Sequence, residues 1–299
     1  MRIIKPSFEI WDQQEGLEGI YKQIERAGRV CYKSEDKITE TSAKEFVERM
    51  IKSGHGAMLE HGTVYLLVEP DFANEDVRLW ELANNKYSEI TFVSSTDLNY
   101  ITTNYRVLVE NDWLDLLKYQ CNPTEYHKKR ITVKFICDRG VSHEFVRHRV
   151  FSFAQESTRY CNYSKDKFGN EITYILPIWS TMPVGEYEVD CIALSKIGQK
   201  EREDYTPDEQ FIEAITNAEW NYFHLLQLGW TPQQARAVLP NSLKTELVMT
   251  GFISDWEHFF KLRDAGNAHP QARELAHPLH MEFLRRNYLV DLYDEANPD

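Results

Sequence analysis

The sequence predicts a single α+β domain in which a mixed sheet is flanked by helices. Segments with the period of amphipathic helices are interleaved along the chain with runs rich in β-branched and aromatic residues. No repeat or low-complexity linker divides the 299 residues. Hydrophobic residues make up 42% of the chain and charged residues 27%, a composition that excludes the disordered and fibrous classes and provides for a large core.

The first half of the chain begins with two predicted helices and continues with strands. Apolar residues at helical spacing predict a helix over 14–28. Ser42 followed by Glu45 is a capping-box pattern that predicts the start of a second helix, and Gly54 is placed to end it. Three strands are predicted from runs that start at Thr63, at Tyr100 (a run that continues to Glu110) and at Ile131, with irregular structure between the first two.

The second half of the chain continues the alternation of helices and strands. A short helix from about Ser142 is predicted to carry Arg147, His148 and Arg149. The other predicted elements are a strand from Ile172, an amphipathic helix over 207–228, a helix that Ser254 and Glu257 cap and that ends at Arg263, and a terminal helix over 271–292.

The charge of the chain argues against two classes of partner. Lys and Arg number 34 against 47 Asp and Glu, and the net charge of −13 disfavours general affinity for nucleic acid or for an anionic membrane. No apolar run reaches the roughly 18 residues of a membrane span, and the first residues lack the apolar segment of a signal peptide. We therefore expect a cytoplasmic protein that binds anionic ligands in a local basic pocket.

Neither a disulfide framework nor a metal site is expected. The five cysteines are odd in number, widely spaced and without a C-x-x-C pair, which indicates reduced thiols: Cys31, Cys121, Cys137, Cys161 and Cys191. His143 and Glu144 resemble the start of a zinc-protease motif, but the next histidine follows at i+5 where a metal pair requires i+4. His277 and His280 have the spacing to share a metal, yet no third ligand lies at a recognisable spacing.

The segment 147–160 concentrates cationic and polar side chains in an acidic chain. Three arginines and a histidine alternate with hydroxyl and amide side chains, which together offer donors to phosphate or carboxylate oxygens. Arg147 and Arg149, two residues apart, diverge in a helix and in a strand alike, so they should contact different ligands. On composition alone, a surface helix end with solvated arginines is an equally good interpretation.

This segment resembles the signature of the flavin-dependent thymidylate synthases. In that family an Arg-His-Arg tripeptide is followed after seven residues by a serine and two residues later by an arginine, and Arg147, His148, Arg149, Ser157 and Arg159 all fit. Four other stretches are similar to the family: KSGHGAMLEH around His55, a strand with Tyr105 and Arg106, ARAVLP at Arg236, and EHFFKLR ending at Arg263. The resemblance covers most of a single domain over 1–299, with insertions at about 62–141 and 165–207.

The resemblance implies an enzyme that methylates dUMP at C5 to give dTMP. It implies methylenetetrahydrofolate as the source of the carbon, NADPH as the reductant and bound FAD as the cofactor. It also implies a homotetramer whose active sites are shared between subunits, without nucleic acid or membrane as partners. The family is thought to polarise the pyrimidine in place, so no cysteine nucleophile is expected.

The resemblance also assigns roles to individual residues. Contacts to dUMP are expected from Glu144, Arg147, Gln155, Ser157, Thr158, Arg159, Arg236 and Arg263. Contacts to FAD are expected from Cys31, His55, Ala57, Arg147, His148, Arg149, Gln155 and His258. Arg263 would be the catalytic residue, because a guanidinium group can stabilise negative charge that develops along the N3 to O4 edge of uracil. Gln155 departs from a glutamate that some members have at this position.

Two other functions compete with this interpretation. A nucleotide- or RNA-binding protein would use the same arginines and would stack bases on Phe153, Tyr160 and Tyr163. A metal-dependent phosphohydrolase would instead draw its ligands from His55, His61, His269 and His277.

Overall fold

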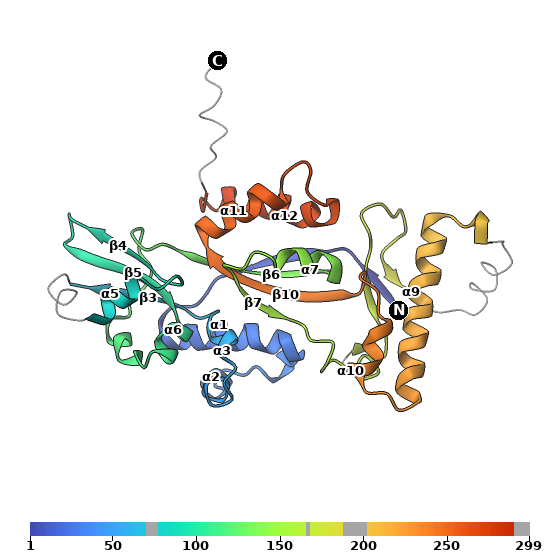
Figure 1. Ribbon diagram of the computed structural model, residues 1–299, viewed down its shortest axis with the longest axis horizontal. Helices are drawn as coiled ribbons and strands as arrows, with labels where there is room; N and C mark the ends of the chain where they lie inside the picture. Colours follow the sequence, from blue (N-terminus) through green and yellow to red (C-terminus); the bar gives the residue numbers. More distant parts are fainter. Residues whose placement is uncertain (70–76, 166–167, 188–201, 290–299) are drawn as a thin grey trace, which may run out of the picture.

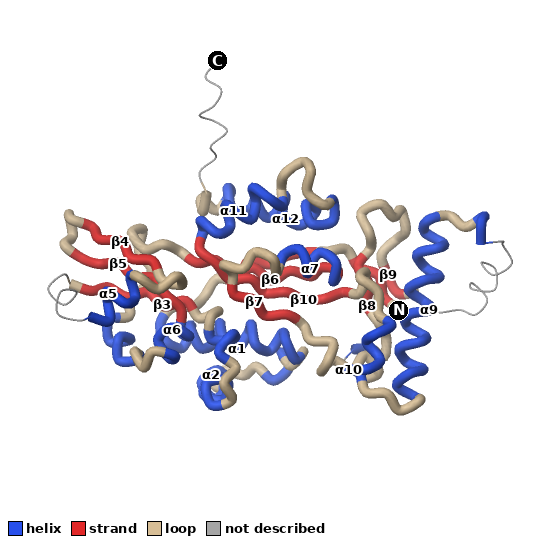
Figure 2. Tube along the Cα trace, in the orientation of Figure 1, coloured by secondary structure: helices blue, strands red, loops and turns tan. Residues whose placement is uncertain are grey.

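The computed structural model describes residues 1–69, 77–165, 168–187 and 202–289, and it confirms the predicted α+β class (Figure 1). A central four-stranded sheet has helices on both faces, and a smaller three-stranded sheet lies at each end of the elongated molecule (Figure 2). Cys191 and the end of the predicted terminal helix lie outside the described residues. No helix in the described ranges is long and apolar enough to cross a membrane.

The central sheet is antiparallel throughout. Its strands are arranged in the order β2 (Ser7–Trp11), β6 (Arg130–Asp138), β10 (Lys244–Phe252) and β7 (Ser152–Gln155). β10 pairs with β6 over nine residues, from Lys244 opposite Asp138 to Phe252 opposite Arg130. β7 pairs with the middle of β10 only, so it forms the edge of the sheet.

Alternate residues of β10 pack against helices on opposite faces of the sheet. Leu247 and Met249 belong to a core formed with α7 (Arg139–Phe145), α11 (Ile253–Arg263) and α12 (Pro270–Arg285). Val248 packs on the other face, where it joins Ala154 and α1 (Gly16–Tyr32). We call these the α11 face and the α1 face. The α1 face also carries α2 (Ser42–Lys52) and α3 (Gly56–Leu59), below the sheet in Figure 1.

The two end sheets are built from different parts of the chain. One has the order β3 (Thr63–Val68), β5 (Leu98–Asn104) and β4 (Glu89–Val93), with α5 (Val77–Ala83), α6 (Tyr105–Glu110) and the 3₁₀ helix η2 (Leu114–Tyr119). The other has the order β8 (Thr173–Ile175), β1 (Arg2–Ile4) and β9 (Gly185–Glu186). It packs near α9 (Pro207–Gln227), α10 (Pro232–Ala235) and η5 (Arg236–Val238). The remaining short helices are η1 (Glu35–Lys37) and η4 (Arg202–Asp204).

Both predicted caps of Ser42 and Ser254 are wrong, although the helices themselves are confirmed. The hydroxyl of Ser42 donates to Glu25 Oε2 at 2.8 Å, and Thr41 precedes the helix instead. In α11 the carboxylate of Asp255 accepts a hydrogen bond from Phe252 N at 2.9 Å, which places the start of the helix before Ser254. For Ser42, the hydrogen bond to Glu25 of α1 replaces the capping bond that the local sequence pattern predicts.

Three further stretches of secondary structure differ from the prediction. The strand from Tyr100 ends at Asn104, whose side chain caps α6 by accepting from Val107 N at 3.2 Å. The terminal helix ends at Arg285, shortly before Asn287 adopts a left-handed conformation at φ 55°. The stretch between β3 and β5, expected to be irregular, contains α5 and β4.

The helix predicted from Ser142 begins earlier and ends earlier than expected. Asp138 Oδ1 accepts from Val141 N at 2.8 Å and so caps a helix that starts at Arg139. This helix, α7, ends at Phe145, and the tripeptide 147–149 therefore lies in the turn that leads into β7. In this turn the two arginines are exposed and His148 between them is buried.

Replacing Gly28 by alanine should lower the free energy of unfolding. A Cβ atom at Gly28 of α1 would lie 2.5 Å from Cζ of Phe46 in α2, so the two helices would have to separate. Overpacking of this kind costs about 1–3 kcal/mol, against which alanine gains about 1 kcal/mol in helix propensity. Because 2.5 Å is well inside contact distance, we expect a cost in the upper part of this range and a net loss of about 1–2 kcal/mol by urea denaturation. Gly266→Ala is the matched control because no atom lies within 4 Å of its Cβ position, and equal stability of the two variants would contradict the packing described.

Candidate active site

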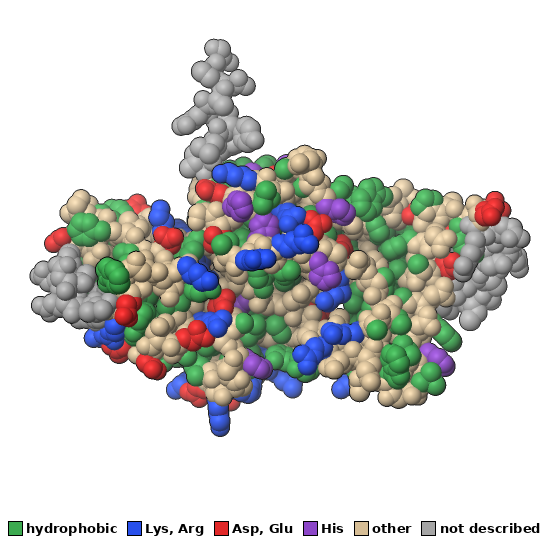
Figure 3. Space-filling view, viewed as in Figure 1, with side chains coloured by type: hydrophobic (Ala, Val, Ile, Leu, Met, Phe, Trp, Pro, Cys, Tyr) green, Lys and Arg blue, Asp and Glu red, His purple; other side chains and the backbone are tan. Residues whose placement is uncertain are grey.

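Lys, Arg and His side chains gather over the middle of the molecule, across α7 and the strands of the central sheet (Figure 3). Most of the predicted site residues belong to this region or border it. They form two groups within one chain. We call Glu144, His148 and Arg263 the Arg263 cluster, and Ser157, Thr158, Arg159 and Arg236 the Arg159 cluster.

The guanidinium group of Arg263 has an acceptor at each of its three nitrogens. Nη1 donates to Glu144 Oε2 at 2.6 Å, and Nη2 donates to the Glu144 carbonyl oxygen at 2.9 Å. Nε donates to Nε2 of His148 at 3.0 Å. An arginine has five N–H groups, so two donors of Arg263, one on each terminal nitrogen, remain for a ligand. The three contacts fix the plane of the group before any ligand binds.

His148 is a buried, neutral acceptor. Its ring is 7% exposed and packs 5.0 Å from the ring of Phe259. Burial, together with the nearby charge of Arg263 and the neighbouring His258, lowers the pKa of His148 to about 4. The imidazole is therefore uncharged at neutral pH with its proton on Nδ1, which leaves Nε2 free to accept from Arg263. His148 was expected to contact FAD, and the structure adds this second role.

Gln155 ends the edge strand β7 on the α11 face. Its Nε2 donates to Ser142 Oγ at 2.9 Å and to Thr245 Oγ1 at 3.2 Å. Ser142 belongs to α7 and Thr245 to β10, so the amide is fixed between two elements that also position the Arg263 cluster. The side-chain oxygen of Gln155 is the acceptor of this amide and can accept from a ligand.

The Arg159 cluster joins the end of β7 to η5. Nη1 of Arg236 donates to Thr158 Oγ1 at 3.2 Å. Nε of Arg159 donates to the side chain of Gln233, which lies one turn before Arg236, at 3.3 Å. Both guanidinium groups are exposed, and neither has an ion-pair partner among the residues that the structure describes. Two exposed cations beside two hydroxyl groups form a suitable donor set for a phosphate monoester. Gln233 carried no signal in the sequence.

Arg147 and Arg149 point their charges to solvent. Within the described ranges neither side chain forms an ion pair or a hydrogen bond, whereas Arg263 is paired with Glu144. Uncompensated guanidinium groups suit the diphosphate of a dinucleotide such as FAD. The donor set of this turn therefore fits the expected cofactor.

Most of the other predicted flavin contacts lie on the α1 face of the sheet. The carbonyl oxygen of Cys31 accepts from Ser157 N at 3.0 Å, and its sulfur lies 3.8 Å from that of Met58, so α1 and α3 meet the end of β7 on the α1 face. His55 precedes α3 and is exposed, as is Ala57 within it. His258 lies on α11, its ring 6.2 Å from that of His148. The predicted FAD contacts thus border β7 from both faces.

Three of the described cysteines are poor nucleophiles at neutral pH. Burial raises the pKa of Cys31 to about 11, and it also raises the pKa values of Cys121 and Cys137. All four cysteines in the described ranges are free thiols. None of these three thiols has the lowered pKa that covalent catalysis requires.

A buried charge network under β7 escaped the sequence analysis. Lys244 Nζ contacts Glu156 at 2.8 Å and Glu246 at 2.6 Å, and Lys33 and Lys134 also reach Glu246 at 2.6 Å. These lysines hold the pKa of Glu246 well below its usual range despite burial. The alternation of Lys244 and Glu246 along an otherwise apolar strand was the available signal. The network anchors the segment that begins the Arg159 cluster.

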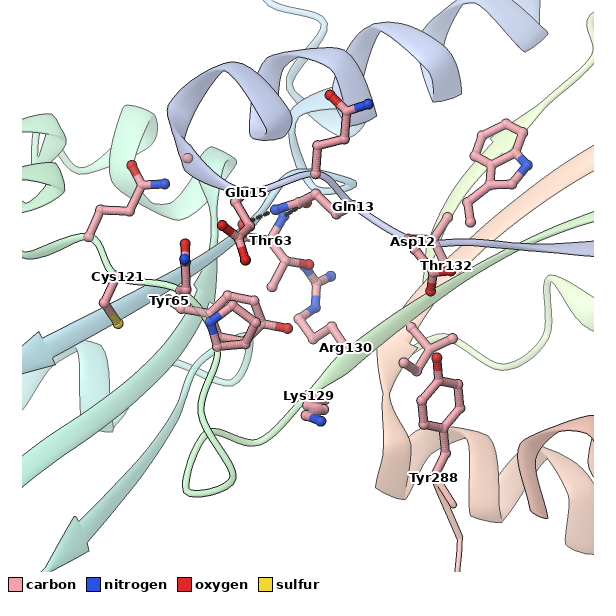
Figure 4. A pocket seen from close by; sticks show the side chains of 17 residues that line it. Asp12, Gln13, Glu15, Thr63, Tyr65, Cys121, Lys129, Arg130, Thr132 and Tyr288 are labelled. Atoms are coloured by element: carbon pink, nitrogen blue, oxygen red, sulfur yellow. Dashed lines mark hydrogen bonds between the residues drawn. The ribbon is translucent and has the colours of Figure 1, made fainter. Parts of the chain in front are cut away.

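The cavity drawn in Figure 4 lies apart from both clusters. It has a volume of about 250 Å³ and separates β3 from the start of β6. Its buried Arg130 already donates to the Glu60 carbonyl oxygen at 3.0 Å and to Ser152 at 3.3 Å, and Gln13 bridges to the backbone of Thr63 at 2.8 Å. These bonds join the end sheet to the central sheet, so we interpret the cavity as part of a structural joint.

The histidines of the phosphohydrolase hypothesis do not come together. His61 is fully buried and bonds to Thr250 at 2.8 Å, whereas His277 lies on α12 and bonds to Asp264 at 2.9 Å. The described residues contain no group of three or more potential ligands that could hold a metal ion. That hypothesis therefore receives no support from the positions of its residues.

Comparison with known proteins agrees with the sequence signature. The family model described as thymidylate synthase complementing protein (Thy1) matches residues 115–286. A flavin-dependent thymidylate synthase from Corynebacterium aurimucosum is 24% identical over 269 residues, which cover 89% of this chain and 76% of that protein.

Further relatives match a shorter region. Flavin-dependent thymidylate synthases from Pyrococcus abyssi and Mycobacterium tuberculosis are 28% and 32% identical over 153 and 149 residues, and this chain spans about half the length of each (53%). Among solved structures, a UMP/dUMP methylase from Streptomyces cacaoi bound with 5-Br dUMP aligns with a TM-score of 0.41 at 17% identity, over 95% of this chain and 93% of that one.

Replacing His148 by glutamine should remove part of the acid sensitivity of the fold. The unfolded state binds a proton at His148 below about pH 6.5, but the folded state does so only below about pH 4. The free energy of unfolding therefore falls as the pH drops through this window, by about 2 kcal/mol between pH 6.5 and 5. In His148→Gln, whose amide oxygen still accepts from Arg263, urea denaturation should show a loss smaller by about this amount. An unchanged pH dependence would mean that the pKa of His148 is not lowered in the folded protein.

Proposed function

Because this chain belongs to the Thy1 family of flavin-dependent thymidylate synthases, we propose that it converts dUMP to dTMP by reductive methylation. In this proposal methylenetetrahydrofolate supplies the carbon, NADPH supplies the electrons, and FAD is the bound cofactor. The observation that carries the proposal is the Arg263 cluster, in which one guanidinium group is fixed by three acceptors and keeps two donors for a ligand.

The Arg159 cluster binds the phosphate of dUMP. Arg159 and Arg236 supply two positive charges, and the hydroxyl groups of Ser157 and Thr158 add neutral donors beside them. A phosphate monoester carries close to two negative charges at neutral pH, which two guanidinium groups can compensate. Since Thr158 and Arg236 are already in contact, little rearrangement is needed on binding.

The Arg263 cluster binds the uracil ring. The two remaining donors of Arg263 face the adjacent N3 and O4 positions, where negative charge develops as C5 becomes nucleophilic. Glu144 neutralises the resting charge of Arg263, and His148 holds the plane of its guanidinium group. Gln155, whose amide is fixed by Ser142 and Thr245, contacts the nucleotide beside Arg263. No cysteine takes part, in agreement with the raised pKa values of the described thiols.

Arg147 and Arg149 in the turn 147–149 would hold the diphosphate of FAD. The cofactor, when bound, supplies the hydride that completes the new methyl group. Cys31, His55 and Ala57 would contact FAD from the α1 face, whereas His258 would do so from the α11 face. One chain presents these groups on two sides of its edge strand. We therefore assign the complete site to a homotetramer, in which residues of the α1 face of one copy meet residues of the α11 face of another.

Replacing Arg263 by lysine tests the proposed function. The wild-type protein should turn yellow with added FAD and should form dTMP from dUMP, methylenetetrahydrofolate and NADPH. Arg263→Lys keeps the charge but loses the planar pair of donors, and loss of one transition-state donor typically costs about a hundred- to a thousand-fold in rate. We expect the variant to keep its fold, its bound FAD and its NADPH oxidation while losing most dTMP formation.

Two results would contradict the proposal. A wild-type protein that neither binds FAD nor forms dTMP would overturn the function as a whole. Near-normal dTMP formation by Arg263→Lys would leave the function intact but would contradict the catalytic role of Arg263. The side chain would then only stabilise the C-terminus of α11 through its positive charge.

A further inference from the structure

A pocket of about 460 Å³ opens on the α1 face, outside both clusters. Its walls are the end of α1, the loop with η1, and α2, and His55 lies on its rim. Three cationic side chains, Arg29, Lys37 and Arg49, line it together with one carboxylate, that of Asp36. Cations therefore outnumber carboxylates in this pocket, whereas the chain as a whole has a net charge of −13.

Two of the three cations are available to a ligand. Arg29 is paired with the buried Glu25 at 2.7 Å, so its charge is already compensated. Arg49 and Lys37 are exposed, and neither forms an ion pair within the part of the chain that the structure describes. A pair of uncompensated cations in a concave site attracts ligands that carry more than one carboxylate.

Aromatic packing holds the arginines in place. The guanidinium carbons of Arg29 and Arg49 lie 4.9 and 5.2 Å from the ring centroid of Phe46, one from each helix. Cation–π contacts of this kind restrict the guanidinium groups of α1 and α2 to the pocket wall. Arg49 is therefore a positioned donor and not a freely solvated side chain.

The pocket adjoins the proposed active site through aromatic rings. Tyr32, which lines the pocket, packs against Tyr160 with ring centroids 5.2 Å apart. Tyr160 follows Arg159 directly, and its ring is 58% exposed. His55, at the other edge of the pocket, is an expected contact of the flavin site. A ligand that extends from the flavin site would thus pass an aromatic surface before it reaches Arg49 and Lys37.

We infer that this pocket binds the oligoglutamyl tail of the folate co-substrate. The inference rests on the proposed function, since it assigns a second part of the same substrate to this chain. A folate consists of a ring that reacts, an aromatic aminobenzoyl linker and one or more glutamates, each of which adds a carboxylate. The aminobenzoyl ring packs on Tyr32 and Tyr160, and the carboxylates of the tail pair with Arg49 and Lys37.

The test compares two folates that differ only in the tail. The FAD-loaded protein is titrated calorimetrically with pteroylmonoglutamate and with pteroylpentaglutamate. We expect tighter binding of the pentaglutamate, with an advantage that declines as salt is added. Arg49→Ala and Lys37→Ala should each reduce the ratio of the two dissociation constants by about two- to five-fold, as expected for exposed ion pairs.

Lys52→Ala is the matched control, because it removes one positive charge from the end of α2 outside the pocket. Equal affinities of the wild type for both folates, or an equal effect of Lys52→Ala on the ratio, would overturn the inference. The ratio of the KM values for mono- and pentaglutamyl methylenetetrahydrofolate provides a second readout. It should change in the variants in the same direction, and by about the same factor, as the ratio of the dissociation constants. Absence of dTMP formation with either folate would overturn the proposed function, whereas the titration would still decide whether the pocket binds the tail.

Discussion

The pairing of β10 with β6 on one side and β7 on the other is the constraint on which the site depends. α7 starts where β6 ends, the turn 147–149 leads into β7, and α11 follows β10 directly. The register of three strands therefore brings Glu144, His148 and Arg263 into contact although more than a hundred residues separate the first from the last. A change in that register would separate the Arg263 cluster even if every residue of the signature were kept.

Within this arrangement of strands, each ionisable residue of the Arg263 cluster either loses its charge or has a partner of opposite charge. His148 loses its charge on burial, and for that reason it can accept a hydrogen bond from Arg263. Glu144 supplies the negative charge that lets Arg263 remain partly buried. Arg147 and Arg149 lack such partners in the described chain and remain exposed for ligands. The same short segment thus contains one residue that organises the site and two that are left to bind.

The sequence predicted the α+β class, most of the strands and a set of candidate site residues, several of which the structure brings together, because hydrophobic period and a long signature are local properties. It did not predict the caps, since Ser42 bonds to Glu25 of another helix. It placed the Arg-His-Arg tripeptide in a helix because the cap by Asp138, several residues earlier, was not recognised. The basic pocket was not predictable either, because Arg29, Lys37 and Arg49 come from separate elements.

In the proposed function the site is completed between copies, because the expected flavin contacts border β7 from two faces. Two variants with defects on opposite faces, His55→Ala and Arg263→Lys, should each form little dTMP alone. When both are expressed together with different tags and isolated as mixed oligomers, random assembly should leave about a quarter of the sites with both native residues, and activity should return to about that fraction. If one copy supplied both residues, every site would keep a defect, and mixed oligomers as inactive as the parents would contradict the account.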